Sequence, residues 1–176
     1  NTAKGENSFN QSMSLPLEHK LVKPPEGIRL TRMPVKEVEN LRSGKVYRLG
    51  SKSIKENSAN PLKDINVELA ELRMEIAPGK AKEVNLNIRG VEAVYDVTSQ
   101  QLVVDGVKAP APLLNGKLSL LIYADRTGLE IFVNNGLMFM PVNINIDDSN
   151  RSLSLSVKGG TAKVSGLEVY ELKSIW

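Results

Sequence analysis

Cysteine is absent from this sequence of 176 residues, and histidine occurs once, at His19. Without cysteine the chain can form no disulfide, cannot hold a metal through thiolates and offers no thiolate nucleophile. A single histidine can build neither a histidine metal site nor a catalytic triad centred on histidine. We therefore expect no cofactor and no metal site, and we interpret His19 as a packing or surface residue.

Aromatic residues and long apolar runs are scarce as well. Aromatic residues make up 5% of the chain, and the basic residues behind the net charge of +3 are scattered along it. A nucleic-acid surface typically gathers basic side chains on one face, and a membrane-spanning helix needs about 20 consecutive apolar residues. The sequence has neither feature, so nucleic acid and membrane are not expected partners.

The clearest structural signal lies in the middle of the chain. Residues 118–122 alternate as a strand with one buried face does, and a polar corner follows them. In residues 129–133 the odd positions form an apolar row, whereas Glu130 and Phe132 share the opposite face. The Asn-Gly pair at 135–136 suits the positive φ angles of a tight hairpin turn. This succession predicts a β-meander.

Similar alternation continues through the C-terminal half. It recurs at intervals of about 8–12 residues, separated by pairs such as Asp-Gly and Gly-Gly, which is typical of a β-sandwich. A change of phase across Gly166 predicts a β-bulge in the last strand. The expected strands are 91–97, 101–104, 117–123, 129–133, 137–140, 142–146, 153–157 and 161–172.

The N-terminal part is expected to form a hairpin and a connector. A Pro-Pro-Glu-Gly turn between apolar segments predicts a hairpin over residues 15–33. Pro34, followed by apolar residues at a spacing of three, predicts a short helix over 34–41. The polar segment 51–60 is expected to be a surface loop. In residues 64–76 helix propensity conflicts with period-2 alternation; because the plain strand that follows needs a partner, we predict a bulged strand.

One pattern points to a family. The residues Asp125-Arg126-x-x-x-Glu130-x-Phe132-x-Asn134-x-Gly136 resemble the C-terminal β-sandwich of glycoside hydrolase family 32, the invertases, levanases, inulinases and other fructan hydrolases. The ending Ser-Ile-Trp at 174–176 resembles the end of that sandwich. The resemblance implies an all-β fold: a two-sheet antiparallel β-sandwich, a concanavalin-like jelly roll, preceded by a hairpin and a short connector helix.

The resemblance also divides the chain. Residues 1–42 correspond to a remnant of the catalytic β-propeller with its linker helix, and residues 43–176 correspond to the C-terminal sandwich module. One departure is Leu17-Glu18-His19, where the family usually has Arg-Glu-Leu. It concerns the packing of that strand alone.

Catalytic motifs of the family are missing from the chain. The resemblance implies a propeller that carries an Asp nucleophile, an Arg-Asp-Pro motif and an acid Glu followed by Cys, and none of these occurs here. We interpret Asp147 and Asp148 as turn residues, and Asp125, Arg126 and Glu130 as a structural charge cluster at the corner. The three residues of this cluster form a structural motif together with Phe132, Asn134 and Gly136. We assign no residue a catalytic role.

The resemblance implies a non-catalytic module that stabilises the propeller of a fructan- or sucrose-cleaving enzyme. Leu15, Leu17, Leu21 and Trp176 are the residues expected at the seam with the propeller. Fructan, sucrose and a second copy of the chain are further candidate partners, and the family favours a secreted, periplasmic or cell-surface location. An alternative is an independent, lectin-like carbohydrate-binding module for levan or inulin, which would need exposed aromatic residues on one sheet face. A third is an adhesion domain unrelated to hydrolases, against which the propeller and linker matches argue.

Overall fold

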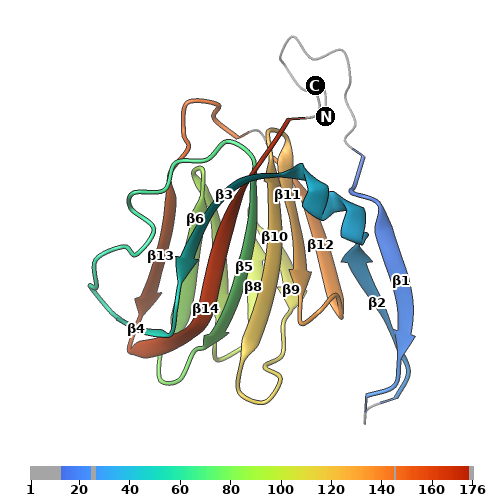
Figure 1. Ribbon diagram of the computed structural model, residues 1–176. Helices are drawn as coiled ribbons and strands as arrows, with labels where there is room; N and C mark the ends of the chain where they lie inside the picture. The colour runs from blue at the N-terminus through green and yellow to red at the C-terminus, as the bar shows by residue number, and fades with distance from the viewer. Residues whose placement is uncertain (1–12, 25–26, 145, 175–176) are drawn as a thin grey trace.

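A computed structural model describes residues 13–24, 27–144 and 146–174, in which two antiparallel sheets lie face to face as a β-sandwich (Figure 1). The larger sheet has the strand order β12-β11-β10-β5-β14-β3, with β4 also paired to β14, and the smaller has the order β13-β6-β7-β8-β9. A separate hairpin, β1-β2, and a 3₁₀ helix, η1, precede the sandwich. The expected all-β sandwich is confirmed.

The elements have the following bounds. The hairpin and helix are β1 (Leu17–Val22), β2 (Arg29–Pro34) and η1 (Lys36–Leu41). The larger sheet comprises β3 (Arg42–Leu49), β4 (Lys52–Lys55), β5 (Ala70–Ala77), β10 (Leu118–Asp125), β11 (Gly128–Val133), β12 (Met138–Asn143) and β14 (Thr161–Leu172). The smaller sheet comprises β6 (Glu83–Ile88), β7 (Val91–Asp96), β8 (Gln101–Val104), β9 (Val107–Pro110) and β13 (Leu153–Lys158).

The main core lies between the two sheets. It is built from the inward-facing half of each strand, because side chains alternate between the two faces of a sheet. In β11 the core residues are Leu129, Ile131 and Val133, as the alternation predicts, and the same pattern of burial runs through β6 and β13. Glu130 and Phe132 therefore point to the outer face of the larger sheet.

A second apolar cluster covers part of that outer face, beneath the hairpin and η1. Phe132 is 1% exposed and packs with Tyr123 of β10, Phe139 of β12 and Val38 of η1. The rings of Phe132 and Phe139 stack with centroids 4.8 Å apart, and Tyr123 meets Phe132 edge-on at 6.4 Å. We call this group the second core; it fixes the hairpin to the sandwich.

The strand predicted over residues 64–76 is partly wrong. The segment is not helical, and β5 pairs with β10 on one side and β14 on the other, but it begins only at Ala70. Before it, the Val67 N–H donates to the Arg151 carbonyl at 2.9 Å and Asn66 bridges Ser152, so this stretch runs irregularly along another loop. The phase slip in the sequence marks the start of the strand and not a bulge.

Other boundaries differ from the prediction for identifiable reasons. The two strands expected over 137–146 are the single strand β12, which includes Pro141 because an edge strand can lack one N–H donor. The polar segment 51–60 contains β4, and β9 was not anticipated. The connector is a 3₁₀ helix, whose three residues per turn match the observed apolar spacing, and Pro34 ends β2 before it. The bulge at Gly166 is confirmed by a register shift there.

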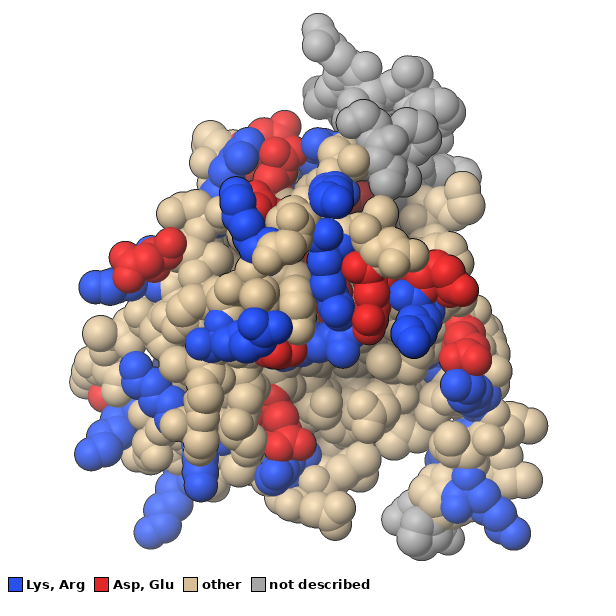
Figure 2. All heavy atoms as spheres, viewed as in Figure 1, with Lys and Arg blue, Asp and Glu red and all other residues tan. Residues whose placement is uncertain are grey.

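Within residues 13–24, 27–144 and 146–174, no helix has the length and hydropathy that a membrane crossing requires. Figure 2 shows basic and acidic side chains interspersed on the visible face, without a large patch of one sign.

Truncating the ring at the centre of the second core should loosen the hairpin. Phe132→Ala is expected to lower the free energy of unfolding by about 3–5 kcal/mol, because it removes a large buried side chain and leaves a cavity. Chemical denaturation measures the change. Val107→Ala, at a residue 49% exposed, is the control and should stay within about 0.5 kcal/mol. A loss no larger than the control's would show that the second core contributes nothing.

Candidate functional site

The most distinctive feature of the outer surface is the seam between the hairpin and the larger sheet (Figure 1). Leu15 and Leu17 are half-buried and pack against the second core. Leu21 lies farther along β1 and is 74% exposed, so it takes no part in this packing. Trp176, the fourth residue expected at a seam, lies outside the described residues.

Gly136 sets how closely the hairpin approaches. Its carbonyl oxygen accepts a hydrogen bond from the Arg32 N–H of β2 at 3.0 Å, and its φ is +80°. A Cβ on Gly136 would lie 2.2 Å from the Arg32 carbonyl oxygen, a distance that no side chain tolerates. The glycine therefore serves both the turn between β11 and β12 and the contact with β2.

Asn134 stabilises the same turn through its side chain. It is buried, has a φ of +50°, and its side-chain Oδ1 accepts the Ser119 N–H at 3.2 Å. Its Nδ2 donates to the Pro112 carbonyl at 2.7 Å. Asn134 thus ties the turn to β10 and to the segment after β9, and an aspartate there could not supply the second bond.

Glu130 reaches the hairpin from the sheet. Its Oε1 accepts the Leu15 N–H at 2.8 Å, whereas its buried Oε2 has no hydrogen-bond partner among the described residues. Burial raises the pKa of this carboxyl above the usual glutamate range, the bond from Leu15 opposes that rise, and the charge of Asp125 adds to it. A buried acceptor left unpaired in this way is unfavourable.

A second polar cluster connects η1 to the sheet. Glu71 of β5 is fully buried and accepts hydrogen bonds from Arg42 Nε at 2.8 Å and Nη2 at 2.7 Å, and from Arg73. Arg73 also reaches Glu39 of η1 at 2.9 Å, and the Arg42 guanidinium lies 4.0 Å from the centre of the Tyr170 ring. Burial alone would raise the Glu71 pKa. The hydrogen bonds and charges of Arg42 and Arg73 outweigh the effect of burial, so the pKa is lowered.

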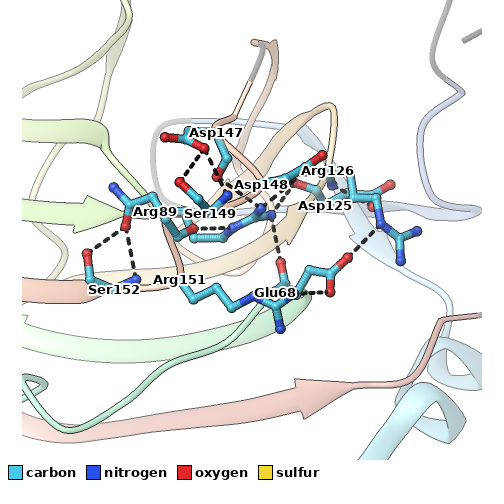
Figure 3. A network of polar contacts seen from close by, with 10 residues as sticks. Glu68, Arg89, Asp125, Arg126, Asp147, Asp148, Ser149, Arg151 and Ser152 are labelled. Atoms are coloured by element: carbon cyan, nitrogen blue, oxygen red, sulfur yellow. Dashed lines mark hydrogen bonds and ion pairs between the residues drawn. The ribbon is translucent and has the colours of Figure 1, made fainter. Parts of the chain in front are cut away.

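Arg89 organises the end of the sandwich where several loops meet (Figure 3). It is 1% exposed, and its guanidinium donates to the carbonyl of Asn150 at 3.0 Å and that of Glu68 at 2.8 Å. A longer bond of 3.4 Å reaches the Asp125 carbonyl. One buried cation thus joins the turn after β6, the segment before β5 and the corner after β10.

The expected cluster of Asp125, Arg126 and Glu130 has a different arrangement. Asp125 is exposed, and its Oδ1 accepts the backbone N–H of Arg126 at 2.7 Å. The Arg126 side chain pairs with Glu68 at 2.7 Å, and Glu68 also pairs with Arg151 at 3.0 Å. Glu130 serves the hairpin instead, as described above.

The other acidic candidates form a turn, as interpreted from the sequence. The Ser149 N–H and hydroxyl both donate to Asp147 Oδ1, at 2.8 and 2.7 Å. In the part of the chain that the structure describes, no group of three or more acidic, histidine or cysteine side chains is placed to hold a metal.

Several of these residues were not singled out from the sequence. Arg89, Glu68 and the Glu71 network act through partners distant in the chain, such as Arg42 and Asn150. One signal was available: Glu71 and Arg73 are separated by two, so in a strand they share the face opposite the core.

The fold and the seam define a class: a two-sheet jelly-roll sandwich with a hairpin packed on the outer face of one sheet. A sequence model of the family described as "Glycosyl hydrolases family 32 C terminal" matches residues 37–171. The chain belongs to this family.

Similar proteins agree with this assignment. A levanase of Bacillus subtilis (strain 168) is 31% identical over 191 residues, covering 96% of this chain and 28% of that protein. A levanase of Bacillus sp. (strain L7) is 27% identical over 191 residues, covering 93% and 20%. The exo-inulinase from Aspergillus awamori superimposes with a TM-score of 0.82 at 20% identity, covering 93% of this chain and 36% of that one. The chain therefore spans less than a third of the levanases it matches.

Two glycines with similar φ angles allow a test of the hairpin contact. Gly136→Ala should destabilise the protein by about 2 kcal/mol or more, because the left-handed conformation costs about 1–2 kcal/mol and the new Cβ meets Arg32. Gly106, with φ +76° and no atom within 4 Å of the place a Cβ would take, is the control: Gly106→Ala should show only the conformational cost. Equal shifts in denaturant midpoint would contradict the contact.

The buried carboxylate should make stability depend on pH. Because the Glu71 pKa is lower in the folded protein than its ordinary value of 4.5, its stabilisation is present above pH 4.5 and is lost as the pH falls through the folded pKa. Glu71→Gln should cost about 3 kcal/mol at pH 7, as removal of one partner of a buried ion pair does.

The prediction is tested by comparing the stability of Glu71→Gln with that of the unmodified protein over a series of pH values. The difference between Glu71→Gln and the unmodified protein should shrink steadily in acid, measured by denaturation at each pH. Glu168→Gln, which removes an exposed pair with Arg48, should cost less than about 1 kcal/mol. A deficit for Glu71→Gln that does not change with pH would argue against an ionised Glu71.

Proposed function

We propose that residues 43–176 of this chain form the non-catalytic C-terminal module of a fructan- or sucrose-cleaving glycosidase. In this proposal residues 1–42 belong to the propeller and its linker, and their hairpin connects the module to the catalytic propeller, which the module stabilises. The parent would be a retaining glycosidase that hydrolyses β-fructosides, in line with the levanases that the chain resembles.

The observation that carries the proposal is the contrast between the two ends of the hairpin. The end next to η1 packs on the second core and meets Gly136, whereas the end near the hairpin turn presents apolar side chains to water, among them Leu21 at 74% and Ile28 at 64% exposure. Leu21 pairs across the hairpin with Leu30, so these exposed groups form a continuous row. An apolar row of this kind is typical of an interaction surface.

The backbone of β1 supports the same conclusion. Among the described strands β1 pairs only with β2, which leaves one of its edges without main-chain partners. Proteins generally cover or charge such edges because they recruit other strands. A neighbouring propeller strand could complete the sheet and bury the apolar row in one contact.

Aromatic residues argue against the alternative of an independent carbohydrate-binding module. Within the described residues no aromatic side chain is exposed: Phe132, Phe139 and Tyr123 belong to the second core, and Tyr95 is buried with its hydroxyl on the Ala111 carbonyl. A flat sugar-binding face would need exposed rings of this kind. The described surface therefore favours packing between domains over sugar binding.

Association with the propeller of the parent enzyme tests the proposal. Leu21→Glu should weaken co-purification of the separately produced propeller and lower its melting temperature in the mixture, while the denaturant midpoint of the module stays unchanged. Val107→Glu, at an exposed residue of β9, should affect neither. Binding that survives Leu21→Glu, or release of fructose from levan, inulin or sucrose by the purified chain alone, would contradict the proposal.

A further inference from the structure

Two Asn-Gly pairs occur in the sequence, Asn115-Gly116 and Asn135-Gly136. In such a pair the backbone nitrogen of the glycine, once hydroxide has removed its proton, can attack the side-chain amide carbon of the asparagine. The absence of a Cβ on glycine leaves the approach open. The new C–N bond closes a cyclic imide as the amide nitrogen takes up a proton from water and departs as ammonia. Water then opens the imide to isoaspartate or aspartate.

The two pairs are closely similar in local structure. Asn115 and Asn135 have φ angles of +51° and +55°, and the glycines that follow them have φ angles of +74° and +80°. Both asparagines are exposed. A difference in reactivity between them therefore comes from how the rest of the fold holds each glycine, and not from the local backbone conformation.

The first pair lies at the exposed tip of a turn. It connects Leu114 and Lys117, whose backbone N–H and carbonyl groups form two mutual hydrogen bonds of 2.9 and 3.0 Å. All four residues of the turn are exposed, and nothing lies within 4 Å of the place where a Cβ on Gly116 would be. Among the described residues the Gly116 N–H has no acceptor. Its nitrogen is therefore open to hydroxide, and the turn needs to break only two bonds to open.

The second pair lies in a turn that is held on several sides. The Gly136 N–H donates to the Val133 carbonyl at 3.1 Å, and the Gly136 carbonyl accepts the Arg32 N–H of β2 at 3.0 Å. Gly136 itself is buried, and the two side-chain bonds of Asn134 fix the preceding residue. A hydrogen-bonded amide keeps its proton until the structure opens locally. Exposure of the Gly136 nitrogen therefore requires this turn to open, and its contact with the hairpin opposes the opening.

We propose that Asn115 is a site of spontaneous deamidation through the Gly116 nitrogen, and that the docked hairpin protects Asn135 from the same reaction. Deamidation places a negative charge at the exposed tip, and the isoaspartate form also adds a carbon atom to the main chain there. The same change at Asn135 would fall on the turn that contacts β2. The hairpin contact is thereby preserved while the exposed turn accumulates the modification.

Peptide mass spectrometry of the full chain tests the proposal during incubation in mildly alkaline buffer. Cleavage after lysine and arginine places the two pairs in different peptides, and fragmentation locates the altered asparagine. Asn115 should react at least about tenfold faster than Asn135, because each additional hydrogen bond that holds the Asn135 turn contributes roughly a factor of five to its opening equilibrium. In strong denaturant the two rates should become similar. Asn115→Gln is the control and should abolish the fast modification, because glutamine closes the larger ring slowly.

A change in the hairpin tests the protective role. Leu17 is half-buried and packs against the second core, whereas Leu21 on the same strand is 74% exposed. Leu17→Ala should loosen the hairpin and speed the reaction of Asn135 several-fold, and Leu21→Ala is the matched control that should leave it unchanged. The rate at Asn115 should be the same in both variants, which also shows that the sandwich remains folded.

The proposal is overturned if Asn115 reacts no faster than Asn135 in the folded chain, if the ratio of their rates is the same in denaturant, or if Leu17→Ala leaves the rate at Asn135 unchanged. All of these rates are measured on the chain by itself, so they do not depend on binding to a propeller.

Discussion

Burial of the outer face of the larger sheet is the constraint on which the rest of the structure depends. Phe132, Phe139 and Tyr123 point away from the main core, and among the described residues the hairpin, the stretch before it and η1 help to shield them from water. Each aromatic side chain of this kind contributes on the order of 2–3 kcal/mol when it is buried. The sandwich therefore needs the N-terminal segment, and that segment takes its position from the sheet beneath it.

Polar contacts define where the hairpin lies on that apolar surface. Apolar packing has little directionality, whereas the Arg32 bond to Gly136 and the Leu15 bond to Glu130 each join one atom to one partner. The Glu71 network does the same for η1 through Arg42 and Arg73. Such groups are costly unless every partner is in place, which makes the arrangement specific as well as stable.

Local patterns predicted much of this fold because strand alternation and turn chemistry are properties of a few consecutive residues. The meander around Glu130, the Gly166 bulge and the three-residue spacing before Leu41 all appear in the structure. The predictions failed where a distant segment decides the local state. Residues 64–69 lie along the 151–152 segment instead of joining β5, and β12 continues through Pro141 because it is an edge strand.

The sequence by itself determined the fold class, the family resemblance and the absence of the known catalytic motifs, because composition, periodicity and short motifs are encoded locally. Only the tertiary structure decided which polar side chains act together. Arg126 pairs with Glu68 and Glu130 with the backbone of Leu15, partners 58 and 115 residues away along the chain. The reason is physical: hydrogen bonds and ion pairs act over a few ångströms in space, and separation along the sequence does not reveal which groups the folded sheets bring within that distance.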